Sequence, residues 1–274
     1  MNEESFSESR ACRLAGMSRS LFNYESIKKE DPKVIQSILN LKEKHPYYGV
    51  PRLLNTLRRQ GFIINGKRVY RITKTLGLTI EKRKKKWNRP FLPERKKLPE
   101  AVCVGDVWAM DFVADRLLNG TPFRCFTIID MLSREVPGIL VRQNMSALTP
   151  LKYLEQLRVE NKIPKHIIVD NGSEFANKAF VLWCEKNRVG LHFIDPGKPV
   201  QNAYIESFNG KFRDEFLSRY QFGNIFEITV ALRKWVKFYN EERPHSALDY
   251  LTPKEFADQE KTVLEKNKSV LKTG

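Results

Sequence analysis

The feature that most constrains this chain is a dense run of positive charge roughly a third of the way along it. Residues 82–97 read KRKKKWNRPFLPERKK; nine of these sixteen residues are Lys or Arg, and two are Pro. Repulsion between like charges resists compact folding, and proline favours extended chain. The sequence therefore predicts a basic linker over residues 81–100, with a separately folded part on each side of it.

The charge is divided unevenly between those two parts. The 274-residue chain has a net charge of +16; residues 1–100 hold 24 Lys or Arg against 10 Asp or Glu, and the remainder holds 24 against 22. A basic module joined to a nearly neutral one is typical of a protein that binds a polyanion, most often nucleic acid. The alternative is that the charge serves solubility alone.

The same sequence disfavours a membrane-embedded or a secreted protein. No stretch approaches 18 consecutive apolar residues, so no membrane span is expected. Residues 1–9 are polar and acidic, without the apolar core of a signal peptide. Four cysteines lack C-x-x-C spacing, which fits a reducing compartment. We therefore expect a cytoplasmic protein without a membrane partner.

The part before the linker has a helical pattern. Two short helices are expected within residues 7–24, and longer ones over residues 32–44, 50–60 and 66–76. In the last helix, an apolar stripe of Val69, Ile72 and Leu76 is expected to be buried. A different face carries the cations Lys67, Arg71 and Lys74. This pattern resembles the recognition helix of a helix-turn-helix, although a plain helical bundle with a solvated charged face remains an alternative.

The part after the linker alternates strands and helices. Strands are expected over residues 102–113, 123–131, 136–142, 166–169 and 190–194, and helices over residues 151–161, 175–188, 202–220 and 225–242. The order β-β-β-α-β-α-β-α-α predicts an α/β fold, a mixed sheet with helices on its faces. The Lys-rich residues 257–274 are expected to form a disordered tail.

Two acids occupy unusual positions in the expected sheet. Asp111 lies inside the apolar first strand, where alternation places it on one face with Val107, Ala109 and Val113. An unpaired carboxylate is costly to bury, so Asp111 is a candidate for chemistry. Asp170 ends a buried strand, at the kind of strand end where α/β proteins form sites.

A third acid lies on the helix expected to begin near residue 202. Ile205, Phe208 and Phe212 form the buried stripe of that helix, and a neighbouring stripe carries Asn202, Glu206, Asn209 and Arg213. Glu206 can thus reach the sheet edge. Convergence of three acids favours Mg²⁺ or Mn²⁺ between them, and two such ions can assist phosphodiester chemistry. The nearby acids Glu174, Asp195, Asp214 and Glu215 compete for this assignment.

These residues also resemble a known family. Trp108-x-x-Asp111-Phe112, Val169-Asp170-Asn171-Gly172 and Asn202-Ala203-x-x-Glu206-Ser207-Phe208-Asn209 are similar to the acidic motifs of bacterial insertion-sequence transposases related to retroviral integrases. Tyr239-Asn240-x-x-Arg243-Pro244-His245 resembles the C-terminal block of that family, and His45-Pro46-x-Tyr48-Gly49 its helical N-terminal block. Over residues 5–256 the chain resembles the second-frame product of the insertion-sequence-three family, within the DDE transposase superfamily.

The resemblance implies a fold and an activity. It implies an RNase-H-like integrase catalytic core over residues 101–256, preceded by a small all-α helix-turn-helix region over residues 1–80. It implies Asp111, Asp170 and Glu206 as catalytic residues and ligands of Mg²⁺ or Mn²⁺, with two ions per site. The implied reaction is DNA strand cleavage and strand transfer at the ends of an insertion sequence, with water and then a 3′-hydroxyl as nucleophile.

The resemblance also implies partners. Double-stranded DNA at the element ends and in the target is the expected substrate, in a bacterial nucleoid, bound by a homo-oligomer. An upstream-frame product, separate or fused, is a further expected partner. Expected DNA contacts come from four places along the chain: Arg213; Asn202 and Asn209 beside the site; Lys67, Arg71 and Lys74; and Lys84, Lys85 and Trp87 in the linker.

Two other functions remain open at this point. A non-catalytic DNA-binding regulator of transposition would use the same basic module without needing three convergent acids. A ribonuclease-H-type nuclease would hydrolyse without joining, but the helical module and basic linker argue against it. Several further residues have expected structural roles only: His45, His166, His192 and His245 are structural or surface residues, and Lys211 is ordinary helix surface. No role for Tyr239, Arg243 or His245 follows from the residues themselves.

Overall fold

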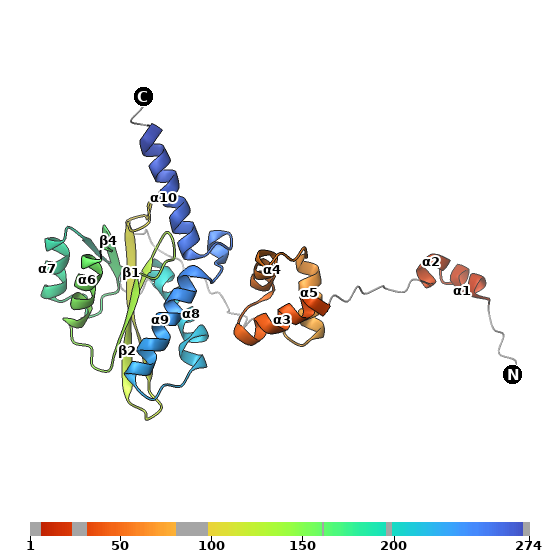
Figure 1. The fold of residues 1–274 in the computed structure, drawn as a ribbon, viewed down its shortest axis with the longest axis horizontal. Coiled ribbons are helices and arrows are strands. Elements are labelled where there is room, and N and C mark those ends of the chain that lie inside the picture. The colour runs from red at the N-terminus through yellow and green to blue at the C-terminus, as the bar shows by residue number, and fades with distance from the viewer. Residues whose placement is uncertain (1–6, 24–31, 81–97, 161, 196–198, 271–274) are drawn as a thin grey trace.

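A computed structural model describes residues 7–23, 32–80, 98–160, 162–195 and 199–270 (Figure 1). The N-terminal helices are α1 (Glu8–Leu14), α2 (Arg19–Phe22), α3 (Pro32–Lys44), α4 (Val50–Arg59) and α5 (Gly66–Thr75). The strands are β1 (Val107–Arg116), β2 (Pro122–Asp130), β3 (Gly138–Arg142), β4 (His166–Val169) and β5 (Gly190–Phe193). The later helices are α6 (Thr149–Val159), α7 (Lys178–Lys186), α8 (Ala203–Glu215), α9 (Ile225–Glu241) and α10 (Pro253–Val270), with short 3₁₀ turns η1 (Pro199–Asn202), η2 (Leu217–Arg219) and η3 (Ser246–Leu248).

The five strands form one mixed sheet in the order β3-β2-β1-β4-β5. β1, β2 and β3 are antiparallel neighbours, whereas β4 pairs parallel to β1, and β5 parallel to β4. The sheet therefore changes from antiparallel to parallel at β1, its central strand. This is the mixed sheet that the sequence predicts.

Helices cover both faces of the sheet (Figure 1). On one face, α8 and α9 pack on β1 and β2 through a core that includes Phe208, Phe212 and Trp235. On the other face, α6 and α7 pack through a core that includes Met110 and Phe180. The alternation expected along β1 is observed, because Ala109 and Val113 belong to the first core and Trp108 and Met110 to the second. Asp111 consequently lies on the face covered by α8.

Helices α3 to α5 bury an apolar cluster of their own, built around Ile38, Leu53, Leu57 and Val69. The expected stripe on α5 is only partly correct, since Leu76 is 39% exposed whereas Thr73 is buried. The Thr73 hydroxyl can be buried because it lies 3.0 Å from the Val69 carbonyl oxygen. A polar residue thus occupies a position of the stripe because its own helix satisfies it.

The α3–α5 cluster contacts the sheet domain through both charged and aromatic groups. The Arg59 guanidinium reaches both carboxylate oxygens of Glu255, at 2.9 and 2.8 Å. The His45 ring stacks on Phe238 of α9 with centroids 5.0 Å apart. Phe238 therefore packs against the α3–α5 cluster as well as against the core under α9.

Some helices and strands begin later than the sequence predicts. β1 begins at Val107 instead of residue 102, because the Asp106 carboxylate accepts main-chain hydrogen bonds from Val102 and Cys103 at 3.1 and 2.7 Å and closes a turn there. α7 begins at Lys178 instead of residue 175, because the Asn177 side chain caps it by accepting from the Phe180 N–H at 2.9 Å. Side-chain caps of this kind fix where an element begins.

The C-terminal segment also differs from the expected disordered tail, because α10 continues to Val270. Thr252 and Glu255 form a reciprocal cap: the Glu255 N–H donates to the Thr252 hydroxyl at 3.2 Å, and the Thr252 N–H donates to the Glu255 carboxylate at 2.8 Å. Pro253 occupies the first helical position, where its missing N–H costs nothing. The capping box thus starts a helix that the Lys-rich composition does not forbid. Within the described residues, no helix is both long and apolar enough to cross a bilayer.

The packing of α8 generates a stability prediction. Phe212 is fully buried between Phe208, Phe216 and Trp235, whereas Phe226 on α9 is 76% exposed. Phe212→Ala leaves a cavity and should lower the free energy of unfolding by about 3–5 kcal/mol. Phe226→Ala, the control, should change it by no more than about 0.5 kcal/mol. Urea unfolding measures both, and equal effects would contradict the assignment of the α8 face.

Candidate active site

The register of the sheet brings Asp111 and Asp170 to neighbouring positions. β1 and β4 pair in parallel with Val107 opposite His166 and Ala109 opposite Ile168. Continuing the same offset places Asp111 level with Asp170, which directly follows β4. Residues at the same level of adjacent strands point to the same face. The strand and strand-end positions identified in the sequence are therefore side by side at the edge where the parallel pairing stops.

Asn209 of α8 holds the Asp111 carboxylate in place. Its amide donates to Asp111 Oδ2 at 2.7 Å, and the Phe112 N–H donates to Asp111 Oδ1 at 2.7 Å. The Thr127 hydroxyl lies 3.0 Å from both Asn209 Oδ1 and the Asp111 carbonyl oxygen. Asn209 is 7% exposed and Thr127 fully buried, so this support is shielded from water. Each oxygen of the Asp111 carboxylate thus has a fixed donor.

Glu206 lies one helical turn before Asn209 and is exposed. Burial raises the pKa of Asp111, and the negative charges of Asp170 and Glu206 raise it further, whereas the Phe112 and Asn209 hydrogen bonds lower it. The three acids are therefore close enough to act on one another electrostatically. Repulsion among carboxylates at a half-buried position is the condition that a cation relieves.

The donor set is composed of carboxylate oxygens, which suits a hard divalent ion such as Mg²⁺ or Mn²⁺. Among the residues that the structure describes, no three Asp, Glu, His or Cys side chains converge closely enough to enclose a metal ion as they stand. Asp170 Oδ1 accepts from the Gly172 N–H at 3.0 Å. A Cβ at Gly172 would lie 2.9 Å from that oxygen, so a larger residue there would displace the Asp170 carboxylate from its present position.

The other two residues of the expected α8 stripe lie at the ends of the helix. Asn202 is 5% exposed, and its buried Oδ1 has no hydrogen-bond partner among the described residues. The Arg213 side chain is exposed and donates to the Ala114 carbonyl oxygen at 3.3 Å. Ala114 lies three residues beyond Asp111 on β1, so Arg213 lies along the strand from the acids instead of among them.

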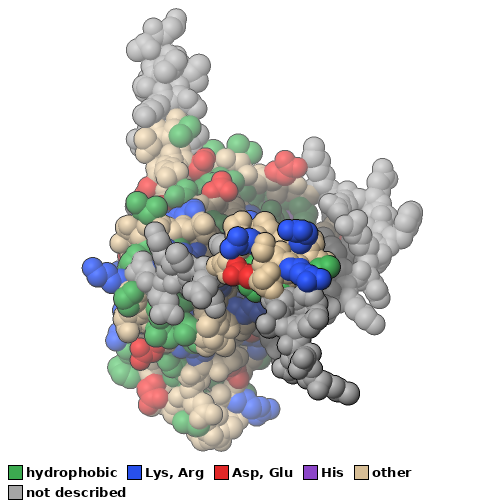
Figure 2. Space-filling view, turned by 90° about the vertical axis from the view of Figure 1, so that its right-hand side faces the viewer, with side chains coloured by type: hydrophobic (Ala, Val, Ile, Leu, Met, Phe, Trp, Pro, Cys, Tyr) green, Lys and Arg blue, Asp and Glu red, His purple; other side chains and the backbone are tan. Residues whose placement is uncertain are grey.

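The basic residues expected on α5 lie on its surface. Lys67, Arg71 and Lys74 are all exposed, on the side of the helix away from the buried Val69. Figure 2, which looks onto the end of the molecule that carries α1 and α2, shows Lys and Arg side chains mixed with acidic ones on the surface nearest the viewer. The expected linker contacts Lys84, Lys85 and Trp87 lie outside the described residues.

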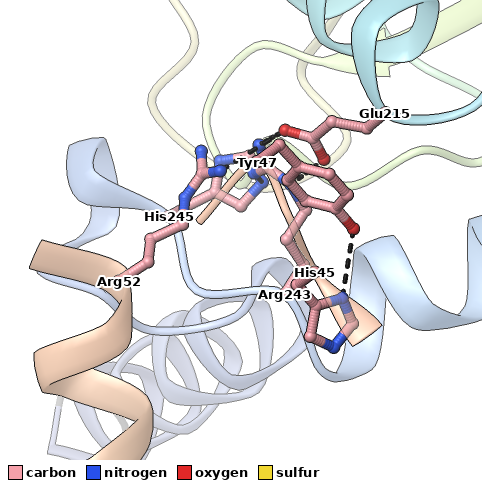
Figure 3. Close-up of polar contacts among 6 residues, drawn as sticks. All are labelled: His45, Tyr47, Arg52, Glu215, Arg243 and His245. Atoms are coloured by element: carbon pink, nitrogen blue, oxygen red, sulfur yellow. Dashed lines mark hydrogen bonds and ion pairs between the residues drawn. The ribbon is translucent and has the colours of Figure 1, made fainter. Parts of the chain in front are cut away.

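A second polar cluster connects α8 to the α3–α5 helices (Figure 3). Glu215, at the end of α8, accepts two bonds from Arg243, at 2.7 Å to Nε and 2.5 Å to Nη2. Arg52 of α4 donates to the same carboxylate at 3.3 Å. Arg243 is fully buried and Glu215 is 5% exposed, so this is a buried ion pair with a third member from the other part of the chain.

His245 completes this cluster. Its Nε2 lies 2.8 Å from Arg243 Nη1 and accepts, since a guanidinium can only donate. Burial, with the positive charges of Arg243, Lys211, Arg52 and Arg134, lowers the pKa of His245 to about 2. The imidazole is therefore neutral.

The buried role of Glu215 was not predicted from the sequence, although the sequence carries a signal for it. Glu215 follows Phe212 by three residues and Phe208 by seven, which aligns it with the apolar stripe of α8. An acid aligned with a buried stripe indicates a buried acid with a cationic partner. Lys211 was also expected on the helix surface, but it is only partly exposed. Of the other histidines, His45 stacks on Tyr48 and Phe238, and His166 lies 3.2 Å from His192, which agrees with structural roles.

Comparisons with known proteins agree with this architecture. An HTH-like domain model matches residues 29–86, and two integrase core domain models match residues 101–199 and 187–253. A simian T-cell lymphotropic virus intasome structure, in complex with a PP2A regulatory subunit, shares the fold with a TM-score of 0.50 and 16% identity, over 81% of this chain and 74% of that one. The sheet, its covering helices and these matches define an integrase-core protein with an HTH-like domain.

Relatives at higher identity place the chain more narrowly. It is 38% identical over 252 residues to an uncharacterized 31.7 kDa protein of insertion element IS407 from Burkholderia multivorans, covering 92% of this chain and 90% of the relative. It is 36% identical to a 39.2 kDa protein of insertion element IS476 from Xanthomonas euvesicatoria, covering 93% and 74%. A transposase of IS904 from Lactococcus lactis is 26% identical, covering 76% and 87%. The chain belongs to the insertion-sequence transposases of the DDE superfamily.

The support given by Asn209 can be tested by removing its side chain. Asn209→Ala deprives Asp111 of its amide donor and should lower the free energy of unfolding by about 1–2 kcal/mol, since a buried hydrogen bond to a charged group is lost. Ser207→Ala, an exposed position on the same helix, should leave stability unchanged within about 0.5 kcal/mol. Urea unfolding measures both; an unchanged midpoint for Asn209→Ala would show that water replaces the amide.

The buried His245 predicts a pH dependence of stability. Its pKa in the folded protein is about 2, against about 6.5 in an unfolded chain, so below pH 6.5 only the unfolded state takes up the proton. From about pH 7 to 5.5 the wild type should lose about 1 kcal/mol of unfolding free energy relative to His245→Gln, which cannot titrate. Urea unfolding at several pH values measures the difference. Parallel profiles for the two proteins would exclude a strongly depressed histidine.

Proposed function

We propose that this transposase cleaves DNA strands at the ends of an insertion element and joins them to a target, in a divalent-metal-dependent reaction. The observation that carries the proposal is the parallel register that sets Asp111 beside Asp170, with Asn209 and Glu206 of α8 above them. A fixed acid, a strand-end acid and an exposed helix acid form an open, oxygen-rich site at the sheet edge. An open site of this kind can receive a phosphodiester.

In this proposal Asp111, Asp170 and Glu206 hold Mg²⁺ or Mn²⁺, two ions per site. When bound, such ions activate an attacking oxygen and stabilise the leaving one, and the nucleophiles are water and then a 3′-hydroxyl. The protein contributes a fixed Asp111, whose two oxygens already have donors on the Phe112 main chain and Asn209. Asn202 and Asn209 border the proposed site, and the buried Asn202 Oδ1, which has no hydrogen-bond partner among the described residues, could accept from a bound group.

DNA is the proposed partner of both parts of the chain. Lys67, Arg71 and Lys74 present cations on one exposed face of α5, within the region matched by the HTH-like model. Arg213, Lys84, Lys85 and Trp87 are proposed as further contacts. The proposed domains are a DNA-binding helical region over residues 1–80, a basic linker over residues 81–100 and a catalytic core over residues 101–256. The proposed setting is a homo-oligomer on bacterial nucleoid DNA in the cytoplasm, with an upstream-frame product as partner or fusion.

Strand joining is the direct test. Purified protein with Mg²⁺ or Mn²⁺ is incubated with a plasmid carrying the DNA that flanks the reading frame, and cleaved and joined products are scored. Glu206→Gln and Asp111→Asn should each lower product formation about 100-fold or more, because each removes a ligand charge worth several kcal/mol in the transition state. Asp214→Asn, an exposed acid on the same helix, is the matched control and should retain activity.

The outcomes separate the candidate functions. Products that need the upstream frame to be fused on would identify the chain as the catalytic module of a larger protein. The three-acid assignment would be contradicted if the fused wild type formed no cleaved or joined products. It would also be contradicted if Glu206→Gln joined DNA as well as the wild type. Either result would favour the alternative function, a non-catalytic DNA-binding regulator of transposition.

A further inference from the structure

A group of cations lies where α8 meets α4, on the side of α8 away from the acids. Tyr204, Lys211 and Glu215 follow each other on α8 by seven and four residues and therefore share one face. Arg52 and Arg243 reach that face by binding Glu215. We call this group, with Arg134, the seam cluster, because it joins residues from both parts of the chain.

Arg134 reaches the same face from the turn between β2 and β3. Its guanidinium lies over the Tyr204 ring, 3.9 Å from the centroid, and donates to the Met131 carbonyl oxygen. The backbone at Arg134 adopts φ of 60°, a left-handed conformation that an arginine rarely takes. Such strain persists where the surroundings hold the residue in place, and here it sets a guanidinium beside the helix.

The charges of the seam cluster do not balance. Four cationic side chains, Arg52, Arg134, Lys211 and Arg243, accompany one carboxylate, Glu215, and His245 is neutral. Arg243 and Arg52 both bind that carboxylate, whereas Lys211 interacts with it only at longer range. Lys211 is partly buried, yet among the described residues its ammonium has no hydrogen-bond or ion-pair partner.

The electrostatics of Lys211 reflect this imbalance. Burial, with the positive charges of Arg243, Arg52 and Arg134, lowers the pKa of Lys211 to about 8, against the opposing effect of Glu215. A partly buried ammonium near three other cations and a single carboxylate is unfavourable unless a further anion joins it. Among the described residues, the positive charge of Lys211 is therefore not fully compensated.

We propose that Lys211 and Arg134, with the partly accessible Arg52, bind a phosphodiester group of double-stranded DNA at the seam cluster. The assignment rests on the proposed function, which makes DNA the partner. A guanidinium presents a planar fork to phosphate oxygens, and a lysine supplies a point charge. One backbone phosphate held here would contact α4 and α8 together and so fix the HTH-like domain relative to the helix that carries Glu206.

The test measures DNA binding without catalysis. Full-length protein is titrated against a labelled duplex of the flanking DNA in EDTA, from about 50 to 200 mM salt. Lys211→Gln should weaken binding about fivefold and reduce the slope of log K against log salt by about 0.9, the value for one phosphate contact. Arg134→Gln should act in the same way, and Lys211→Arg should retain the wild-type slope.

The matched control is Lys152→Gln, an exposed lysine on α6, on the opposite face of the sheet. It should leave both affinity and slope unchanged. Thermal unfolding without DNA provides a second readout: Lys211→Gln should keep or raise the wild-type midpoint, because it removes repulsion. A cation with a merely structural role would lower the midpoint when removed.

Three results would overturn the assignment. An unchanged salt slope for both Lys211→Gln and Arg134→Gln, with intact DNA binding, overturns the seam site and leaves the proposed function standing. In the second result, inorganic phosphate raises the unfolding midpoint of the wild type and leaves that of Lys211→Gln unchanged. If the salt slope of DNA binding is also the same for both proteins, the site binds free phosphate instead of DNA. If the wild type binds no duplex, either alone or fused to the upstream frame, the result contradicts both the proposed function and this assignment.

Discussion

The structure depends most on the burial of one face of α8 against the sheet. Ile205, Phe208 and Phe212 are fully or almost fully excluded from solvent between β1, β2 and α9. Burial of three large apolar side chains fixes the rotation of the helix about its axis, since any other rotation would expose them. Every other residue of α8 then has a determined direction. Glu206 and Asn209 face the acids of the sheet, and Lys211 and Glu215 face α4.

The ion pair of Glu215 and Arg243 extends this constraint to the α3–α5 helices. A buried ion pair contributes little net stability, but breaking it leaves an uncompensated charge, so its geometry is specific. Arg52 binds the same carboxylate from α4, and His45 stacks on Phe238 of α9 nearby. The HTH-like domain is thus attached to the helix of the candidate site through polar contacts that tolerate little displacement.

Much of this arrangement could be predicted from local pattern. Strand alternation places Asp111 on the α8 face, and helical spacing places Glu206 and Asn209 together, because both depend on neighbours in sequence. The pairing of Glu215 with Arg243 spans 28 residues and with Arg52 spans 163, and no local periodicity carries such contacts. The same limit explains why Lys211 was expected on the surface. The first residues of β1, α7 and α10 depend instead on capping side chains at Asp106, Asn177 and Thr252.

The two working faces of α8 also restrict how this chain can change in length over evolution. Insertion or deletion of one residue within Ala203–Glu215 turns everything beyond it by about 100° relative to everything before it. Such a change between Glu206 and Glu215 would keep one face in register and misalign the other. Insertions are therefore expected to accumulate in connections such as that between α6 and β4, while the number of residues from Glu206 to Glu215 stays constant among relatives.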